Sequence, residues 1–304
     1  MEAASIVVTG AHGFLGRHVA RCLARKGHTV LGLGHGDWSR AEWESWGLSS
    51  WHRCDVTLQS LVQYAGSPAV IMHCAGSASI AYSLENPVGD FERTVATTEH
   101  VLEFVRLHAP DCRVVYPSSA GVYGTVERLP IREDSPTAPI SQYGVHKRMA
   151  EQAITSHAQQ FGTTAAIVRL FSVYGCGLRK QLLWDACRKF AGHDNIFMGT
   201  GDEVRDWLHV EDASELLLTA LEHASSKCPV VNGGSGEGVT VREVLTHLGS
   251  SFEQKPDFSG AQRAGDPSRY IADIESAKAW GWRPVHHWKA GVDEYAAWWK
   301  RSSP

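Results

Sequence analysis

Short runs of β-branched and apolar residues alternate with amphipathic stretches along the first half of the chain. The first run, residues 6–8, leads into a glycine-rich turn, after which Leu15, Val19 and Leu23 recur at the fourfold spacing of one helix face. Further apolar runs predict strands over residues 28–33, 51–56, 70–76 and 113–116. We expect the last of these strands to stop at Pro117 and a helix to occupy residues 94–107. This alternation predicts an α/β fold with a doubly wound parallel sheet, the Rossmann arrangement.

The turn after the first strand has the pattern of a nucleotide site. Gly10 allows a tight turn, Gly13 allows the backbone to approach a phosphate, and Gly16 allows the helix to pack close to the strand. The backbone N–H groups of Phe14 and Leu15 then stand at the positive end of the helix. Strand, glycine turn and helix together predict that a dinucleotide pyrophosphate binds here.

The end of the second strand bears on the choice between NAD and NADP. An acidic residue about 20 residues beyond the glycines accepts the ribose hydroxyls of NAD, whereas a basic group suits a 2′-phosphate. Gly34 occupies that place here, and His35, Arg17 and Arg40 are close to it in the sequence. NADP(H) is therefore the expected cofactor, with NAD(H) as the alternative in which Gly34 merely eases a turn.

Two further strand ends add candidate cofactor contacts. The third predicted strand ends at Asp55 and Val56, where the carboxylate is placed to bond the adenine amino group. The fourth strand runs into Ala75 and Gly76, small residues that permit a close approach of the cofactor.

Catalytic chemistry is expected at the carboxyl ends of these strands. Ser119 follows the fifth strand, and Tyr143 and Lys147 lie four residues apart on a predicted helix, so they share a face. A lysine beside a phenol favours the phenolate and is expected to lower the tyrosine pKa. Tyr143 is then a candidate general acid and base.

Composition excludes several classes of protein. The 304 residues are 43% hydrophobic and 20% charged, and a net charge of −4 offers no attraction for nucleic acid or an anionic membrane. No signal peptide or membrane-spanning run is evident. The seven cysteines lack a CxxC pair, which is typical of reduced thiols in a cytoplasmic protein. The 16 histidines form no HExxH or clustered His/Cys pattern, so no metal site is expected.

The motifs together resemble those of one family almost from end to end. TGAHGFLG, CDV, HCAG, VVYPSSAGVYG and YGVHK are similar to the cofactor-binding and YxxxK motifs of the extended short-chain dehydrogenase/reductases. VRLFSVYGCG, GTGDEVRDWLHVEDA and RAGDPSRYIADIESAKAWGW resemble the motifs of its nucleotide-sugar epimerases, dehydratases and reductases.

This resemblance implies residue roles. Tyr143 would be the catalytic acid/base, Lys147 would bind the nicotinamide ribose, and Ser119 would bond the substrate oxygen. The substrate would be a nucleotide sugar, and its diphosphate would be held by arginines, which suit that group. Four residues form the implied substrate set: Ser172, Arg205, Arg263 and Asp266. The family also implies a homodimer.

The resemblance further implies a division of the chain. Residues 1–170, with 206–235 returning to them, would bind the dinucleotide. Residues 171–205 and 236–304 would form a smaller C-terminal region over the nucleotide sugar. Residues 229–234 are expected to return as a strand, and Thr240 is expected to cap a helix.

Departures from the family pattern narrow the reaction. Ala120 and Gly121 stand where dehydratases have an Asp-Glu pair, so a 4,6-dehydratase is not expected. Thr94 and Ser172 stand where the family has asparagines, and Cys176 stands in place of a proline. The favoured activity is reduction of a nucleotide-linked 4-keto-6-deoxyhexose, because Gly34 points to NADPH. A nucleotide-sugar 4-epimerase is the alternative, and a non-catalytic dinucleotide-binding protein comes third because Ser119, Tyr143 and Lys147 are all present.

Overall fold

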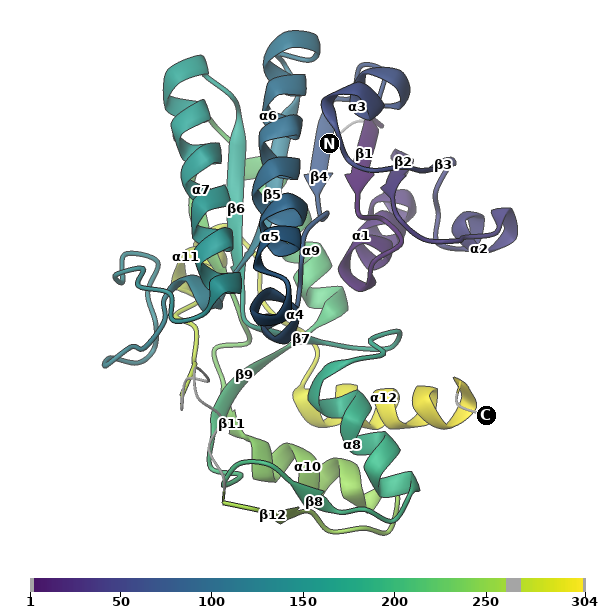
Figure 1. The fold of residues 1–304 in the computed structure, drawn as a ribbon, viewed down its shortest axis with the longest axis vertical. Helices are drawn as coiled ribbons and strands as arrows, with labels where there is room; N and C mark the ends of the chain where they lie inside the picture. Colours follow the sequence, from purple (N-terminus) through teal and green to yellow (C-terminus); the bar gives the residue numbers. More distant parts are fainter. Residues whose placement is uncertain (1–2, 261–268, 303–304) are drawn as a thin grey trace.

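The computed structural model describes residues 3–260 and 269–302. Seven parallel strands form its central sheet, in the order β10-β6-β5-β4-β1-β2-β3 (Figure 1). Their bounds are β1 Ser5–Thr9, β2 Thr29–Gly34, β3 Ser50–Arg53, β4 Val70–His73, β5 Arg113–Ser119, β6 Ala165–Leu170 and β10 Val230–Gly233. The order reverses between β1 and β4, and open α/β sheets bind their ligands at such a point, beyond the carboxyl ends of the strands. The predicted doubly wound parallel sheet is confirmed.

Helices cover both faces of the sheet, and the residues of β1 show why. Ile6 and Val8 belong to the apolar cluster that includes α1 (Phe14–Arg25) and α9 (Val210–His223), while Val7 belongs to the cluster on the opposite face. All three side chains are fully buried, as expected of a parallel strand covered on both sides. The helices on the second face are α3 Leu58–Tyr64, α6 Thr97–His108 and α7 Gln142–Phe161.

Shorter elements complete the upper part of the molecule in Figure 1. They are α2 Arg40–Ser45, α4 Ile80–Glu85, α5 Pro87–Phe91, the π-helix η1 Glu92–Ala96, the 3₁₀ turn η2 Ala120–Val122 and α11 Glu275–Ala279. The single helix expected over residues 94–107 is thus a π-helical turn followed by α6.

Pro117 lies inside β5, so the prediction that the strand stops there is wrong. Val114 N–H donates to the carbonyl of Thr164 on the β6 side, so residues 115 and 117 face the β4 side. Pairing between β4 and β5 ends at Met72–Val115. A missing N–H at Pro117 therefore costs no ladder hydrogen bond.

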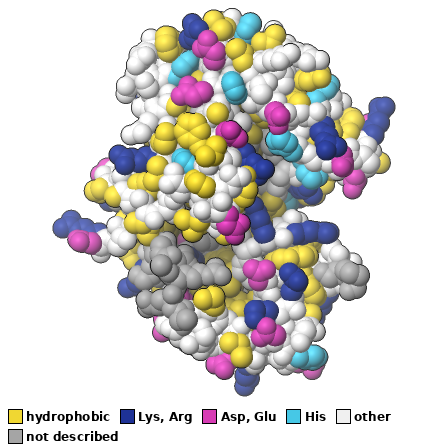
Figure 2. Space-filling view, viewed as in Figure 1, with side chains coloured by type: hydrophobic (Ala, Val, Ile, Leu, Met, Phe, Trp, Pro, Cys, Tyr) yellow, Lys and Arg dark blue, Asp and Glu magenta, His cyan; other side chains and the backbone are white. Residues whose placement is uncertain are grey.

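A smaller part packs below the sheet around its own apolar cluster, which contains Phe190, Trp207, Leu248 and Tyr295 (Figure 1). Its elements are β7 Ser172–Tyr174, α8 Gln181–Ala191, β8 Ile196–Phe197, β9 Val204–His209, β11 Gly238–Thr240, α10 Val241–Ser250, β12 Asp257–Phe258 and α12 Trp288–Ser302. Thr240 caps α10 through a reciprocal capping box with Glu243. Figure 2 shows the surface hollowed between the two parts, with Lys and Arg side chains along the hollow.

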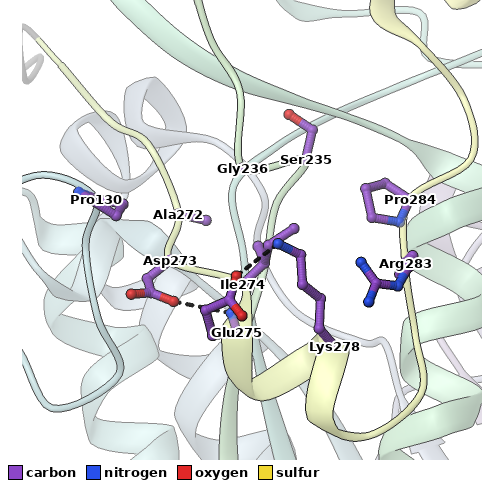
Figure 3. Close-up of a pocket in the computed structure, with 10 residues that line it drawn as sticks. All are labelled: Pro130, Ser235, Gly236, Ala272, Asp273, Ile274, Glu275, Lys278, Arg283 and Pro284. Atoms are coloured by element: carbon purple, nitrogen blue, oxygen red, sulfur yellow. Dashed lines mark hydrogen bonds and ion pairs between the residues drawn. The ribbon is translucent and has the colours of Figure 1, made fainter.

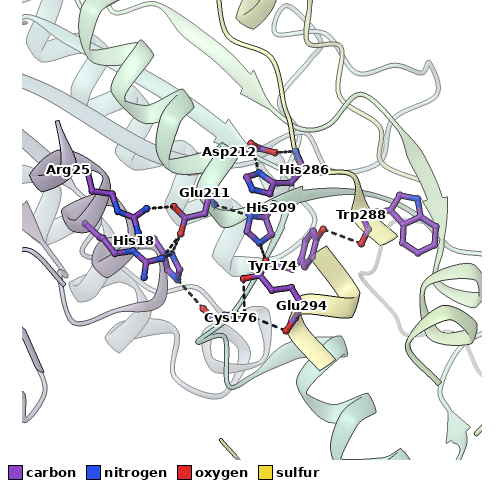
Figure 4. Close-up of polar contacts among 11 residues, drawn as sticks. His18, Arg25, Tyr174, Cys176, His209, Glu211, Asp212, His286, Trp288 and Glu294 are labelled. Atoms are coloured by element: carbon purple, nitrogen blue, oxygen red, sulfur yellow. Dashed lines mark hydrogen bonds and ion pairs between the residues drawn. The ribbon is translucent and has the colours of Figure 1, made fainter. Parts of the chain in front are cut away.

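Polar contacts join the two parts close to α1 (Figure 4). His18 of α1 places one ring nitrogen 2.9 Å from Glu211 of α9 and the other 3.0 Å from the carbonyl oxygen of Cys176. Cys176 in turn lies 3.4 Å, from Sγ to Oε1, from Glu294 of α12. Burial raises the pKa of the Cys176 thiol to about 12, so this cysteine is held as a thiol and serves packing. The contacts hold the smaller part against the part that contains the seven-stranded sheet.

Candidate active site

The glycine turn meets the end of β4 at the point where the strand order reverses. Gly10 has φ +66°, and a Cβ there would lie 2.8 Å from the backbone of Ala75. A Cβ on Gly16 would lie 2.3 Å from the carbonyl oxygen of Gly10. Gly13 caps α1 without a side-chain hydrogen bond, which leaves the backbone of Phe14 and Leu15 unshielded by a cap. Side chains at these glycines would fill the space beside the turn. Without them the backbone forms an open cradle, and this cradle fits a dinucleotide pyrophosphate.

The loop after β4 is pinned to the glycine turn by Thr9 and His73. Thr9 Oγ1 accepts the N–H of Ala75 at 3.1 Å and lies 2.8 Å from Nδ1 of His73. Burial lowers the pKa of His73 to about 3, so its ring is neutral. Gly76 has φ +148°, and the Nζ of Lys147 lies 3.7 Å from the place of its Cβ. The predicted residues Ala75 and Gly76 therefore lie between the glycine turn and the catalytic helix.

Ser119, Tyr143 and Lys147 come together at the carboxyl end of β5, as predicted. The Ser119 hydroxyl lies close enough to Tyr143 to affect the pKa of its phenol. Gly121 lies beside both, since a Cβ there would be 3.4 Å from Ser119 Oγ and 3.6 Å from the Tyr143 ring. The Lys147 ammonium donates a 3.0 Å hydrogen bond to the carbonyl of Pro117. That carbonyl is available because β4 has already ended beside it.

The pKa of Tyr143 differs from the sequence expectation. Burial raises it, Asp90 adds to the rise, and the Ser119 hydroxyl acts in the opposite direction. The expectation that Lys147 lowers it is wrong here, because the ammonium is directed at the Pro117 carbonyl. Burial lowers the pKa of Lys147 from 10.5 to about 8, so the pKa of this amine lies close to neutral pH.

At the end of β2, where the adenosine ribose is expected, the backbone explains why position 34 is glycine. Gly34 has φ +147°, and a Cβ there would lie 3.3 Å from the backbone of Gly10. An acid at this position would therefore be strained whatever the cofactor. His35 pairs with Asp55 at 3.1 Å, and both side chains are exposed. Val56 is buried in the sheet core.

The basic residues near this end are all engaged. Arg17 donates from Nε to the carbonyl oxygen of His12 at 3.2 Å and lies over the rings of Trp38 and Trp46, each with its centroid 5.3 Å away. Arg40 pairs with Glu44 at 2.7 Å, and Arg53 pairs with Asp37. Of the basic residues that the sequence assigned to a 2′-phosphate, Arg40 is thus paired with a carboxylate, and Arg17 is held by neutral groups.

The predicted substrate set is only partly described. Ser172 begins β7 and pairs in register with Trp207 of β9. Arg205 lies in β9 opposite Val239 and donates to the carbonyl of Val204 at 3.0 Å. Arg263 and Asp266 lie outside the described residues. Convergence of the two arginines on a diphosphate stays a prediction.

Three residues that support the site carry no sequence signal of that role. Ser83 of α4 accepts the backbone N–H of Tyr143 at 3.0 Å. Thr94 is fully buried and accepts the N–H of Ser77 at 3.2 Å. Threonine therefore holds the loop after Gly76, although its side chain is shorter than the asparagine of the family pattern. Asp90 of α5 reaches the catalytic helix from a position 53 residues before Tyr143. Their contacts depend on how α4 and α5 pack, which no local pattern reveals.

A separate hollow of ≈ 400 Å³ lies away from this chemistry (Figure 3). Pro130, Ser235 and Arg283 are among the residues that line it, and Lys278 and Glu275 form an ion pair at 2.7 Å along α11 at its edge. No helix in the described part of the chain is long and apolar enough to cross a membrane. Among the described residues, no group of three or more His, Cys, Asp and Glu side chains is arranged to hold a metal.

Comparison with known proteins agrees with this geometry. The chain is 30% identical to a UDP-glucose 4-epimerase of Azospirillum brasilense, over 98% of this chain and 92% of that protein. It superposes on the UDP-glucose 4-epimerase of Brucella ovis in complex with NAD with a TM-score of 0.85, at 26% identity over 97% and 98% of the two chains. The structure of the Thermotoga maritima UDP-glucose 4-epimerase shares the fold, with a TM-score of 0.87, 23% identity and coverage of 99% and 100%. The model of the NAD dependent epimerase/dehydratase family matches residues 6–234, and this chain belongs to that family.

Proposed function

We propose that this protein is a 4-epimerase of UDP-sugars that holds NAD. The observation that carries the proposal is that Ser119, Tyr143 and Lys147 lie together beside a glycine cradle that suits a dinucleotide. The relatives reported above are named UDP-glucose 4-epimerases, and none is named a reductase. The 4-keto reductase, which the sequence favoured, loses its main support because that support was the expectation of NADP.

NAD is the proposed cofactor for two reasons. The backbone at Gly34 requires glycine, so the absence of an acid there says nothing about a 2′-phosphate. The nearby basic side chains of His35 and Arg53 already face Asp55 and Asp37. A 2′-phosphate would have to break these pairs and approach two carboxylates, whereas ribose hydroxyls can bond them.

The side chains support reversible removal of a proton from a sugar hydroxyl. When bound, NAD would accept a hydride from C4 and return it. Tyr143 would take the proton of the C4 hydroxyl at Oη and later give it back, while Ser119 bonds the same substrate oxygen. The Lys147 ammonium, 3.0 Å from the Pro117 carbonyl, would bond the nicotinamide ribose. Ala120 and Gly121 supply no acid or base for eliminating water.

The test is to identify the cofactor that purifies with the protein and to assay UDP-glucose against UDP-galactose. We expect tightly held NAD(H) and interconversion of the two sugars without added cofactor. Bound NADP(H), together with NADPH-dependent reduction of a UDP-4-keto sugar, would contradict the proposal. UDP-glucuronate and UDP-N-acetylglucosamine are the alternative substrates to test, because solved relatives are named for them.

Pairing of two copies remains part of the proposal. Leu107 of α6 and Phe161 of α7 are 49% and 56% exposed, so this side of the molecule has apolar surface that a second copy could cover. Light scattering on the purified holoprotein measures the mass, and a monomer at micromolar concentration would contradict the homodimer.

A further inference from the structure

Asp90 of α5 and His146 of α7 form a buried pair behind the catalytic helix. Oδ2 of Asp90 lies 2.5 Å from Nδ1 of His146, and the two side chains are 0% and 4% exposed. The second ring nitrogen of His146 lies 2.8 Å from Nε2 of Gln142. The ring edge of Phe91 packs on the imidazole, with centroids 5.6 Å apart. The imidazole is therefore held on three sides.

Packing and stability do not account for this pair. The second oxygen of Asp90, Oδ1, is buried without a hydrogen-bond partner. A buried carboxylate with one oxygen unpaired is costly, and an apolar pair of similar volume is usually at least as stable. Buried unsatisfied groups of this kind call for a functional explanation.

The pair holds the turn of α7 that carries the catalytic groups. His146 directly precedes Lys147 and follows Tyr143 by one helical turn. The α4–α5 segment thus contacts this turn twice, through Ser83 at the Tyr143 N–H and through Asp90 at His146. These two contacts from one segment fix the position of this turn of α7 along the helix axis and its rotation about that axis relative to β5.

The charge of Asp90 also acts on both catalytic groups. It raises the pKa of Tyr143, adding to the larger effect of burial, because it opposes the phenolate. It also raises the pKa of Lys147, against the larger lowering by burial, because it favours the ammonium. The other titratable groups that face these two in the described part of the chain are His73 of β4, Cys74 after it, Tyr116 of β5 and Glu151 of α7. Glu151 is already bound by Arg169 at 2.8 Å.

We propose that Asp90 and His146 are positioning residues that hold Tyr143 and Lys147 in place and set the charge around them. The inference rests on the proposed function, since that function gives the two groups their catalytic roles. Asp90 acts through its negative charge, and His146 supplies the hydrogen bond that stabilises this buried carboxylate in its ionised form. Loss of either residue therefore shifts the pH dependence of the site in the same direction, to lower pH.

The first test replaces Asp90 by an isosteric neutral residue. Asp90→Asn keeps an oxygen for His146 but removes the charge, so both limbs of the kcat–pH profile should move to lower pH. Glu92→Gln is the matched control. Glu92 lies two residues after Asp90 and is exposed, so the variant also removes one negative charge, but from a position where water screens it. Its profile should coincide with that of the wild type. An Asp90→Asn profile that also coincides with the wild type would overturn the proposal.

The second test removes the imidazole. His146→Ala leaves the Asp90 carboxylate buried without a hydrogen-bond donor, which favours its neutral form, so the profile should move to lower pH and kcat should fall while KM for the sugar changes little. His146→Asn restores a donor to Asp90 and should recover most of both effects. No shift in His146→Ala, or no difference between Ala and Asn, would show that the pair only fills space. This test stands alone if Asp90→Asn does not fold.

A spectroscopic readout separates failure of this inference from failure of the proposed function. The tyrosinate absorbance of Tyr143 is obtained by subtracting the titration of Tyr143→Phe from that of the parent, and it requires no substrate. Asp90→Asn and His146→Ala should both lower this tyrosinate midpoint. If no UDP-sugar is turned over but these shifts occur, the proposed substrate is wrong and the positioning pair stands. If turnover is normal and the midpoint does not move, the pair has no effect on the site.

Discussion

The ammonium of Lys147 and the carbonyl of Pro117 form a 3.0 Å hydrogen bond that joins α7 to β5. The bond exists because the pairing of β4 with β5 ends at Val115, two residues before Pro117, so the Pro117 carbonyl has no partner within the sheet. Lys147 also lies 4.6 Å over the ring of Tyr116 in the same strand. The end of β5 therefore fixes the lysine that the proposed reaction uses.

Tyr143→Phe should abolish turnover and leave NAD binding intact. The phenylalanine keeps the ring packed beside Gly121 and removes only the hydroxyl that carries the proton. General acid–base help is worth roughly 10²–10⁴-fold, so kcat should fall by about that factor. Steady-state kinetics and the cofactor content after purification measure the two effects. Near-normal turnover would remove Tyr143 from the mechanism.

Gly34→Asp should destabilise the protein without creating a preference for NAD. The φ of +147° and a Cβ 3.3 Å from the Gly10 backbone make any side chain there unfavourable, at a cost of about 1–3 kcal/mol. Thermal unfolding and titration with NAD and NADP measure the result. Gly27→Ala is a control for positive φ alone, since nothing lies within 4 Å of its Cβ. A stable Gly34→Asp variant with sharpened NAD selectivity would restore the NADP interpretation.

The low pKa of Lys147 predicts two pH effects. Activity that needs the ammonium should fall as the pH rises through about 8. In the folded protein the amine releases its proton near pH 8, whereas in the unfolded chain it does so near 10.5. Between these values the unfolded state binds more protons, so the free energy of unfolding of the wild type increases with pH. The Lys147→Met variant lacks this contribution. The free energy of unfolding of the wild type minus that of the variant, measured by denaturant at several pH values, should therefore increase over this window. A flat difference would contradict the shift.

Breaking the Arg169–Glu151 pair should strongly destabilise the protein. Arg169 of β6 donates to both oxygens of Glu151 of α7 and, at 3.0 Å, to the hydroxyl of Tyr123, all in a buried setting. Glu151→Gln leaves the guanidinium without its counter-charge, at a cost of about 3–5 kcal/mol. The exposed pair Arg106–Glu103 is the control, because Glu103→Gln should cost less than about 1 kcal/mol. Equal losses in the two variants would refute the argument from burial.

Arg205→Ala should weaken UDP-sugar binding and leave NAD binding nearly unchanged. Arg205 lies in β9, outside the seven-stranded sheet that carries the glycine turn. Arg263→Ala is expected to act in the same way. Calorimetric titration of the holoprotein with UDP measures substrate affinity, and cofactor content reports on the dinucleotide site. Loss of both affinities together, or of neither, would contradict the assigned role.

The local pattern of the sequence was enough to predict the parallel sheet, the glycine cradle and the meeting of Ser119, Tyr143 and Lys147. These features depend on short-range rules: apolar runs make buried strands, glycines permit positive φ, and residues four apart share a helix face. Parallel strands also end at a common edge, so residues that follow different strands are brought together. The family resemblance added the reaction class.

Only the tertiary structure decided the roles of Pro117, Gly34 and Asp90. Pro117 stays in its strand because a neighbouring strand happens to end beside it, and Gly34 is required by the backbone of a turn 24 residues away in the sequence. Asp90 reaches His146 across 56 residues of chain. Each role depends on which groups pack against the residue, and such contacts between distant segments leave no periodic trace in the sequence. The burial that sets the protonation of Tyr143 and Lys147 arises from the same packing.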